Sequence, residues 1–396
     1  MRSLGSRKRW LAGLGGLLLL FSGAGALADE VPPEAVLAEL PFLDSPEPNR
    51  VLVDLAPDGS AKPLRLMLDT GASEAVLTPR AARELGVQVR RTKQDAYRRP
   101  TRLGRDLQFY IDTRSSDTAS KTGWEYGVFG GQFLSEYVLE IDFPGRRVRL
   151  IDPERFSVPA SVAASDQAVL PVRMVSQRPG VEVSIDGAKS LLMLDTGWPG
   201  PAVISGGLAK RAKLSSAPVP GLTAGTVLGD MEVELGEARS LRFGPFEFND
   251  VLLTVAPKGW YNIGFPDNSV IGYDLLAPFV LRLDYPNQRL WLRRVSHAPL
   301  AFYGSDVATW RKAGIFLLEQ DGRHQAWIVR PDGLGAKRGL QPGDWIAGMD
   351  SAQAIAAALS EGEELTVIRE SNGIGVDTVL EAATPADAVS APQQNP

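Results

Sequence analysis

The tripeptide Asp-Thr-Gly occurs twice in this chain, each time after the same apolar lead-in, Leu-Met-Leu. The first is Asp69-Thr70-Gly71 and the second is Asp195-Thr196-Gly197, 126 residues further on. One such tripeptide is ordinary turn chemistry after a buried strand. Two with matching lead-ins indicate a duplicated unit that presents one carboxylate from each half. This duplication constrains the fold more than any other feature of the sequence.

The similarity between the two halves continues on both sides of the tripeptides. The matching segments are Leu40-Pro41 with Leu170-Pro171 at the openings, Gly130 with Gly272 after an apolar pair, and the closing hairpins 141–150 with 283–292. The offset is 130 residues at the openings and 142 at the glycines and hairpins. The second copy is therefore longer between Asp195 and Gly272, and we expect an additional or longer β-hairpin there.

Alternating apolar residues favour half-buried strands in both copies, as at Val51–Leu55 and Val181–Ile185. We expect short helices at Pro79–Leu85, Gly131–Tyr137, Gly207–Lys213 and Tyr273–Pro278. The pattern predicts a mainly β chain whose two copies each have a common domain size.

The apolar run, Asp-Thr-Gly and later apolar pair with glycine resemble the aspartic protease family, and more narrowly the bacterial retropepsin-like proteases. The resemblance covers about residues 39–296. It implies two tandem acid-protease (retropepsin-like) β lobes, 39–158 and 168–296, that form a pepsin-like pseudo-dimer within one chain. One chain carrying both halves implies a monomer; a homodimer that pairs each tripeptide across chains is the alternative.

The resemblance assigns the catalytic role of an aspartic endopeptidase to Asp69 and Asp195. It also assigns supporting roles: threonines that lock the two loops together, glycines that let the loops turn, a serine that hydrogen-bonds the outer oxygen of Asp69, and glycines that pack beside each loop. These residues are Thr70 and Thr196, Gly71 and Gly197, Ser73, and Gly130 and Gly272.

The chemistry of such a pair follows from electrostatics. Two carboxylates about 3 Å apart cannot both ionise cheaply, so the pair holds one proton between them. The ionised member takes a proton from water while the protonated member donates to the scissile carbonyl of a peptide or protein substrate. This chemistry implies no metal and no organic cofactor.

The second loop departs from the family pattern because it continues as Trp198-Pro199, where the first continues as Ala72-Ser73. No hydroxyl then lies beside Asp195. This departure leaves open an alternative function, a catalytically weak or inactive two-lobed scaffold that binds peptides without cutting them.

Aromatic and basic residues give two further hypotheses. Trp124 and Trp260 occur at matching places in the copies, where they line a peptide cleft or belong to the core. A basic run is either a solvated hairpin edge or a rim that attracts acidic substrate segments. Its members are Arg90, Arg91, Lys93, Arg98, Arg99, Arg102 and Arg105.

The chain changes character in residues 297–381. The stretch 336–346, Ala-Lys-Arg-Gly-Leu-Gln-Pro-Gly-Asp-Trp-Ile, resembles the PDZ domains of exported bacterial proteases. Such domains bind an extended peptide as an added strand. The resemblance implies a small α+β domain that recruits or gates substrate, with Gly314, Ile315 and Phe316 at the carboxylate-binding loop. We expect a groove helix at 351–359 and a strand at 364–369.

The two ends of the chain predict export and disorder. Residues 1–28 combine a basic start, a short apolar core and an Ala-Leu-Ala cleavage pattern, so we expect a signal peptide cleaved after Ala28 and a periplasmic location; an uncleaved anchor is the alternative.

Removing the four basic residues of this segment takes the net charge from −5 to −9, which argues against a nucleic-acid partner. The chain has no cysteine, which excludes disulfides and thiolate chemistry. No later segment is apolar enough to span a membrane, and residues 382–396 have a disordered composition.

Overall fold

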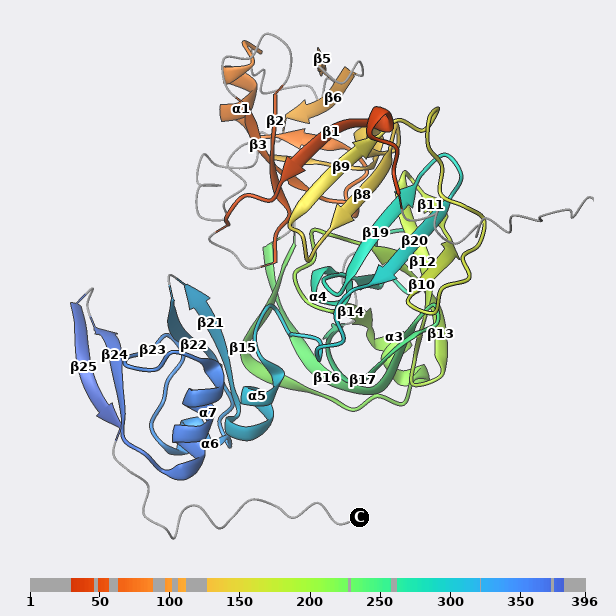
Figure 1. Cartoon of the computed structure of the whole chain (residues 1–396). Helices are drawn as coiled ribbons and strands as arrows, with labels where there is room; N and C mark the ends of the chain where they lie inside the picture. The colour runs from red at the N-terminus through yellow and green to blue at the C-terminus, as the bar shows by residue number, and fades with distance from the viewer. Residues whose placement is uncertain are drawn as a thin grey trace, which may run out of the picture.

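The computed structural model describes residues 30–45, 49–56, 63–87, 97–101, 106–111, 127–226, 229–257, 262–320, 322–371 and 374–380. Strands make up 48% and helices 15% of the structure, which confirms the expected mainly β class. The described strands form four sheets (Figure 1). Across the described ranges, no helix has the length and apolar character needed to cross a bilayer. The expected signal peptide and C-terminal tail lie outside these ranges.

The first copy forms a six-stranded sheet in the order β2-β3-β7-β4-β6-β5. Its elements are β2 (Leu52–Leu55), β3 (Leu64–Leu68), β4 (Ala75–Leu77), α1 (Pro79–Glu84), β5 (Tyr97–Pro100), β6 (Asp106–Ile111), β7 (Gly127–Phe129) and α2 (Gly131–Leu134). Helix α1 begins where expected because the hydroxyl of Thr78 accepts the N–H of Ala81 and Pro79 occupies the first turn.

The second copy forms an eight-stranded sheet in the order β11-β12-β13-β18-β14-β17-β16-β15. Its elements are β11 (Arg173–Val175), β12 (Arg178–Ile185), β13 (Ala188–Leu194), β14 (Ala202–Ser205), α3 (Gly206–Arg211), β15 (Ser216–Thr226), β16 (Gly229–Phe243), β17 (Phe246–Ala256), β18 (Val270–Ile271) and α4 (Tyr273–Leu276). The neighbour relations of the first copy recur here, since β13 is parallel to β18 as β3 is to β7. The long hairpin of β15 and β16 is the additional length expected in this copy.

The closing hairpins of both copies combine in a third sheet, β1-β9-β8-β19-β20-β10. Its strands are β1 (Val36–Pro41), β8 (Val138–Asp142), β9 (Arg147–Ile151), β10 (Gln167–Pro171), β19 (Phe279–Asp284) and β20 (Arg289–Arg294), with a 3₁₀ helix at Pro33–Ala35 before β1. The antiparallel pairing of β8 with β19 joins the two copies through backbone hydrogen bonds.

A buried ion pair lies at the centre of this shared sheet. Arg282 of β19 donates to Glu140 of β8 over 2.6 Å, and both side chains are at most 5% exposed. Arg149 donates to the other oxygen of Glu140 over 3.2 Å. The guanidinium of Arg282 also lies 4.2 Å from the ring centroid of Trp291. The carboxylate of Glu140 in the first copy and the guanidinium of Arg282 in the second copy therefore neutralise each other across the boundary between the copies.

The C-terminal part forms a five-stranded sheet with three helices, and we call it the C-terminal unit (residues 302–380). Its elements are α5 (Val307–Ala313), β21 (Ile315–Gln320), β22 (Arg323–Val329), α6 (Leu334–Lys337), β23 (Trp345–Ile346), α7 (Ala352–Glu361), β24 (Leu365–Ser371) and β25 (Ile374–Leu380). The expected helix at 351–359 and strand at 364–369 are confirmed by α7 and β24. Strand β25, which pairs with β24 at the sheet edge, was not expected.

The C-terminal unit is packed directly onto the second copy. One buried apolar cluster contains Trp198 and Leu222 of the second copy together with Tyr303, Trp310 and Phe316 of the C-terminal unit. Strand β15 contacts β22 at this boundary. An ion pair of 2.5 Å joins Arg311 of α5 to Glu237 of β16. The unit therefore shares a core with the second copy.

We predict that Glu140→Ala lowers the free energy of unfolding by about 3–5 kcal/mol, because it leaves the buried guanidinium of Arg282 without its partner. Glu39→Ala is the matched control, since Glu39 bonds the same Arg149 from an exposed position and should cost less than about 1 kcal/mol. Urea denaturation of both variants measures the difference. Equal, small losses would contradict the role given to the buried pair.

Candidate active site

The structure brings Asp69 and Asp195 together. Each follows the last residue of a buried strand, β3 or β13, and each backbone N–H donates to the strand beside it. These bonds are 3.2 Å to the carbonyl of Phe129 and 2.9 Å to that of Ile271. The two half-buried carboxyl groups share a hydrogen bond. Residues 126 positions apart thus form one dyad.

Reciprocal hydrogen bonds of two threonines hold the two loops together beneath this pair. The hydroxyl of Thr70 donates to the carbonyl of Leu194 over 2.8 Å and accepts the N–H of Thr196 over 3.1 Å. The hydroxyl of Thr196 donates to the carbonyl of Leu68 over 2.8 Å and accepts the N–H of Thr70 over 3.1 Å. Both threonines have no exposed surface. Thr70 and Thr196 thus lie between the two loops, at the positions that the resemblance to aspartic proteases implies.

Gly71 and Gly197 are needed because a larger side chain would clash with the opposite aspartate, and not because the backbone requires a conformation that only glycine adopts. A Cβ atom on Gly71 would lie 2.5–2.7 Å from the carboxyl atoms of Asp195, and one on Gly197 would lie 2.8–2.9 Å from those of Asp69. Neither glycine has a positive φ, so another residue could adopt its backbone conformation. The sequence-based expectation of a turning role was therefore wrong in its physical reason, because the contact crosses between the copies.

Two further glycines lie beside the loops. A Cβ atom on Gly130 would meet the carbonyl oxygens of Ala72 and Glu74 at 2.5 and 2.7 Å. One on Gly272 would meet the carbonyl oxygens of Trp198 and Gly200. Both glycines pack against the backbone of an aspartate loop, as expected.

Burial raises the pKa of both carboxyl groups, and that of Asp195 is raised well above its usual range. Repulsion from Asp69 and the shared hydrogen bond raise the pKa of Asp195 further. The Oδ1 atom of Asp69 accepts two backbone N–H groups, from Gly71 at 2.8 Å and Ala72 at 3.0 Å. Asp195 accepts one, from Gly197 at 2.8 Å. This asymmetry favours the negative charge on Asp69 and the shared proton on Asp195.

Arg50 supplies a positive charge beside the dyad. Its guanidinium donates a hydrogen bond to the carbonyl of Gly197, and its charge lowers the pKa of both carboxyl groups against the effect of burial. The sequence alone did not predict a role for this residue. Nothing in the local pattern before β2 distinguishes it, because its partner lies 147 positions away.

Ser73 and Trp198 mark the difference between the two loops. The hydroxyl of Ser73 forms no hydrogen bond with the described residues, so the expected bond to Asp69 is absent from this part of the chain. The amides of Gly71 and Ala72 bond Asp69 instead. Trp198 is only 6% exposed, and its side chain packs away into the apolar cluster shared with the C-terminal unit. The Trp-Pro continuation therefore leaves the Gly197 bond to Asp195 intact.

A second buried carboxyl group, that of Asp274, lies in the first turn of α4. It accepts the side-chain amide of Asn49 over 2.7 Å, and the same amide nitrogen donates to the carbonyl of Pro199 over 2.9 Å. It also accepts the N–H groups of Tyr303 and Gly304. This junction joins the first copy, the Asp195 loop and the C-terminal unit. Burial raises the pKa of Asp274 to about 7.

The remaining expected site residues are either buried in the C-terminal unit or outside the described residues. Ile315 and Phe316 are fully buried, and Gly314 ends helix α5 in the left-handed conformation. The side chains of Ile315 and Phe316 pack in the cores of the C-terminal unit and of its boundary. Binding of a carboxylate by the backbone of this loop stays a prediction. Trp124 and Trp260 lie outside the described residues, and so do most members of the basic run.

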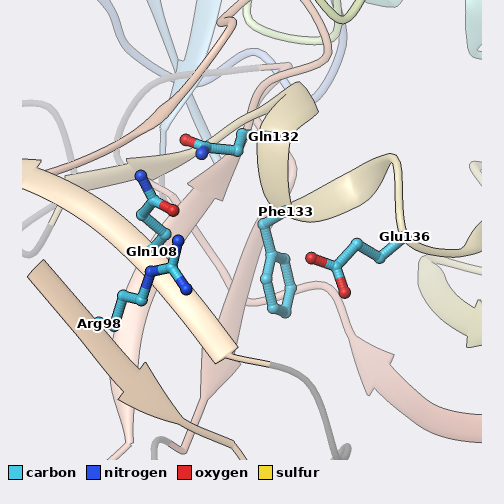
Figure 2. Close-up of a pocket in the computed structure, with 5 residues that line it drawn as sticks. All are labelled: Arg98, Gln108, Gln132, Phe133 and Glu136. Atoms are coloured by element: carbon cyan, nitrogen blue, oxygen red, sulfur yellow. The ribbon is translucent and has the colours of Figure 1, made fainter. Parts of the chain in front are cut away.

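Arg98, from that basic run, lines a small pocket in the first copy (Figure 2). The other lining residues are Gln108, Gln132, Phe133 and Glu136. Its volume is about 100 Å³, well below the roughly 300 Å³ at which small-molecule sites begin. Neither dyad carboxylate lines it. In the described ranges no group of three or more histidine or carboxylate side chains is placed to hold a metal ion.

Comparison with known proteins gives one family match. Residues 181–275 match the family model described as aspartyl protease. The matched segment runs from β12 into α4 and includes Asp195, Thr196 and Gly197. This match supports a protease hydrolase. A search of curated protein sequences finds no match.

Two solved structures are similar to parts of the chain. A retropepsin-like aspartic protease from Rickettsia conorii is 20% identical, with 32% of this chain and 90% of that one covered and a TM-score of 0.25. The EIAV protease complexed with the inhibitor HBY-793 is 21% identical, with 25% and 85% covered and a TM-score of 0.20.

We predict that Thr196→Val lowers the free energy of unfolding by about 1–3 kcal/mol, because it leaves the N–H of Thr70 and the carbonyl of Leu68 without partners. Thr70→Val should cost about the same. The double variant should cost less than the sum, since the two hydroxyls form one network. Thr366→Val is the control, because its hydroxyl bonds none of the described residues. Additive losses measured by denaturation would contradict the shared network.

We predict that Asp274→Asn becomes progressively more stable relative to wild type as pH rises from about 4 to about 7. In this window the unfolded carboxyl group is ionised while the folded one, with its pKa of about 7, keeps its proton, so wild type loses stability. Tyr273 and Tyr303 are the ionisable groups that face it, and both stay neutral there.

Asp267→Asn is the control for this pH dependence. The hydrogen bond from Arg211 lowers the pKa of Asp267, so its contribution to stability is present above about pH 4 and is lost only at lower pH. The difference between Asp267→Asn and wild type should therefore be constant from pH 4 to 7. A flat profile for Asp274→Asn over the same range, measured by urea denaturation at each pH, would contradict the buried neutral carboxyl.

Proposed function

We propose that this chain is an aspartic endopeptidase that hydrolyses peptide bonds with water activated by Asp69 and Asp195. The observation that carries the proposal is the contact between the two half-buried carboxyl groups, held by the reciprocal bonds of Thr70 and Thr196. Two carboxyl groups in such a site share one proton, and a dyad with one proton has both a base and an acid available.

The hydrogen bonds around the dyad support different roles for its members. Asp69 accepts two backbone amides and is the better carboxylate, so it takes the proton from the attacking water. Asp195 holds the shared proton and donates it to the carbonyl oxygen of the scissile bond. When the C–N bond breaks, Asp69 gives the proton taken from water to the leaving amine. Asp195 takes back a proton from a hydroxyl of the diol intermediate as the carboxyl product forms, which restores the starting state of the pair. The charge of Arg50 keeps the pair from taking up a second proton too readily.

The proposal includes a two-lobed architecture. Lobe 1 (39–158) and lobe 2 (168–296) each supply one aspartate. The shared sheet with its β8–β19 pairing supports the hypothesis that the two lobes form a pseudo-dimer within a monomer. A substrate is an extended peptide or unfolded protein segment. The peptide-binding scaffold is the weaker alternative, because the Trp198-Pro199 continuation that motivated it leaves the amide bond to Asp195 in place.

The C-terminal unit is proposed to be a PDZ-like domain that gates the site. Recruitment by strand addition needs an open strand edge beside a helix. Here α5 packs against both β21 and α7, and the hydroxyl of Ser305 accepts the N–H of Leu317 on the outer edge of β21 over 2.9 Å. The chain's own connecting segment thus covers the place where an added strand would bind, which favours gating over recruitment.

Export to the periplasm is also part of the proposal. It rests on the signal-like sequence of residues 1–28 and on the lack of cysteine throughout the chain. The acidic net charge supports a protein substrate over nucleic acid.

We predict that Asp69→Asn and Asp195→Asn each abolish cleavage of an unfolded protein substrate while the fold is retained, because each role needs its own carboxyl group. Asp54→Asn is the control, since Asp54 is a partly exposed carboxyl on β2 that is ion-paired with Arg65, and this variant should cleave at the wild-type rate. Circular dichroism and thermal unfolding check the fold. Cleavage by either dyad variant at the wild-type rate would sink the proposal.

We predict that cleavage falls as pH rises, because the dyad loses its shared proton through the raised pKa of Asp195. Arg50→Gln should shift this alkaline limb to higher pH, since removing a positive charge raises the pKa of both carboxyl groups. Arg65→Gln, an exposed arginine on β3, should leave the profile unchanged. The profile of kcat/KM against pH measures both; an unmoved limb in Arg50→Gln would show that its charge does not act on the dyad.

A further inference from the structure

Tyr303 of the C-terminal unit contacts the segment that follows the second Asp-Thr-Gly. This residue lies in a tight turn between β20 and α5, where Phe302 and Ser305 form an isolated β-bridge. Its φ of +53° lies in the left-handed region, which is uncommon for a bulky residue and is maintained only by surrounding contacts. The turn is held because Asp274 accepts the backbone N–H groups of both Tyr303 and Gly304.

The ring of Tyr303 packs on the segment that follows the second Asp-Thr-Gly. Its centroid lies 5.8 Å from that of Trp198 at an interplanar angle of 69°. A Cβ atom on Gly200 would lie 2.9 Å from the ring, so this glycine is needed for the ring to approach the backbone. The hydroxyl lies 3.4 Å from that of Thr254 on β17. Only 8% of the residue is exposed.

The packed segment is connected directly to the dyad. Trp198 follows Gly197, and its N–H donates to the backbone carbonyl of Asp195 over 3.2 Å. Its own carbonyl accepts the N–H of Tyr273 in α4 over 2.8 Å. The next residue of α4 is Asp274. Tyr303 thus supports the Asp195 loop through two contacts. Its ring packs on Trp198, and its backbone N–H donates to Asp274, which lies next to the Tyr273 that bonds Trp198.

Among the described residues, the first loop has no equivalent contact with the C-terminal unit. Its continuation is Ala72-Ser73, and no residue of the C-terminal unit belongs to the apolar cluster that contains the first copy. Trp198 follows the second tripeptide where the first has Ala72. This larger side chain brings the second loop into contact with Tyr303.

We propose that Tyr303 is a positioning residue for Asp195, and that docking of the C-terminal unit through this turn sets the geometry of the dyad. This inference rests on the proposed function, since it assigns to Tyr303 an effect on the rate of the same reaction. It explains how the C-terminal unit gates the site without touching substrate.

The test compares cleavage of a short unstructured peptide by the full-length protein and three variants. Tyr303→Ala should lower kcat about 10- to 100-fold, as a displacement of a reacting group by about 1 Å does, with KM within about twofold of wild type. Tyr303→Phe keeps the ring contacts and should retain kcat. Trp310→Ala is the matched control, because Trp310 belongs to the same buried cluster and its ring stacks on Phe316 at 4.3 Å, whereas the ring of Tyr303 packs on Trp198. This variant should lose stability and keep kcat.

The outcomes separate the possibilities. Wild-type kcat in Tyr303→Ala, or equal losses in Tyr303→Ala and Trp310→Ala, overturns the positioning role while the proposed function stands. No cleavage by wild type, or full cleavage by Asp69→Asn, overturns the proposed function and the role of Tyr303 with it. If Tyr303→Ala does not fold, Tyr303→Leu, which fills more of the space, takes its place with the same expected loss of kcat.

Discussion

The structure depends on holding two carboxyl groups in contact inside a half-buried site. Two ionised carboxylates would repel each other and would be better solvated apart. Hydrogen bonds that fix the two loops must therefore offset this repulsion and the loss of solvation. The crossed hydrogen bonds of Thr70 and Thr196 do this, because each hydroxyl bonds the backbone of the opposite copy. Gly71 and Gly197 remove the side-chain volume that would otherwise separate the loops.

The crossed bonds need the two copies to keep a fixed relation, and the shared six-stranded sheet supplies it. Backbone pairing of β8 with β19 sets the register between the copies, and the fully paired Arg282 and Glu140 favour that register, since a shift would leave buried charges without partners. A site made of two halves thus depends on a sheet that belongs to neither half alone.

The C-terminal unit adds an asymmetry that the duplicated copies lack. Its apolar face continues the core of the second copy and ends at Trp198, one residue beyond the second tripeptide. Asp274 connects this boundary to Asn49 of the first copy by a hydrogen bond to a carboxyl group whose pKa burial raises to about 7. The proposed positioning role of the C-terminal unit therefore concerns Asp195 and not Asp69.

The sequence alone determined the duplication, the mainly β class, the positions of α1 to α4, and the placing of Asp69 and Asp195 at strand ends, because these follow from local periodicity, capping and repeated motifs. Only the tertiary structure decided that Arg50 lies beside the dyad and that Asp274 joins the first copy to the C-terminal unit. It also decided that the glycines provide space and that Ile315 and Phe316 are buried. Those contacts join residues tens to more than two hundred positions apart, and no local pattern records which distant surface will cover a side chain.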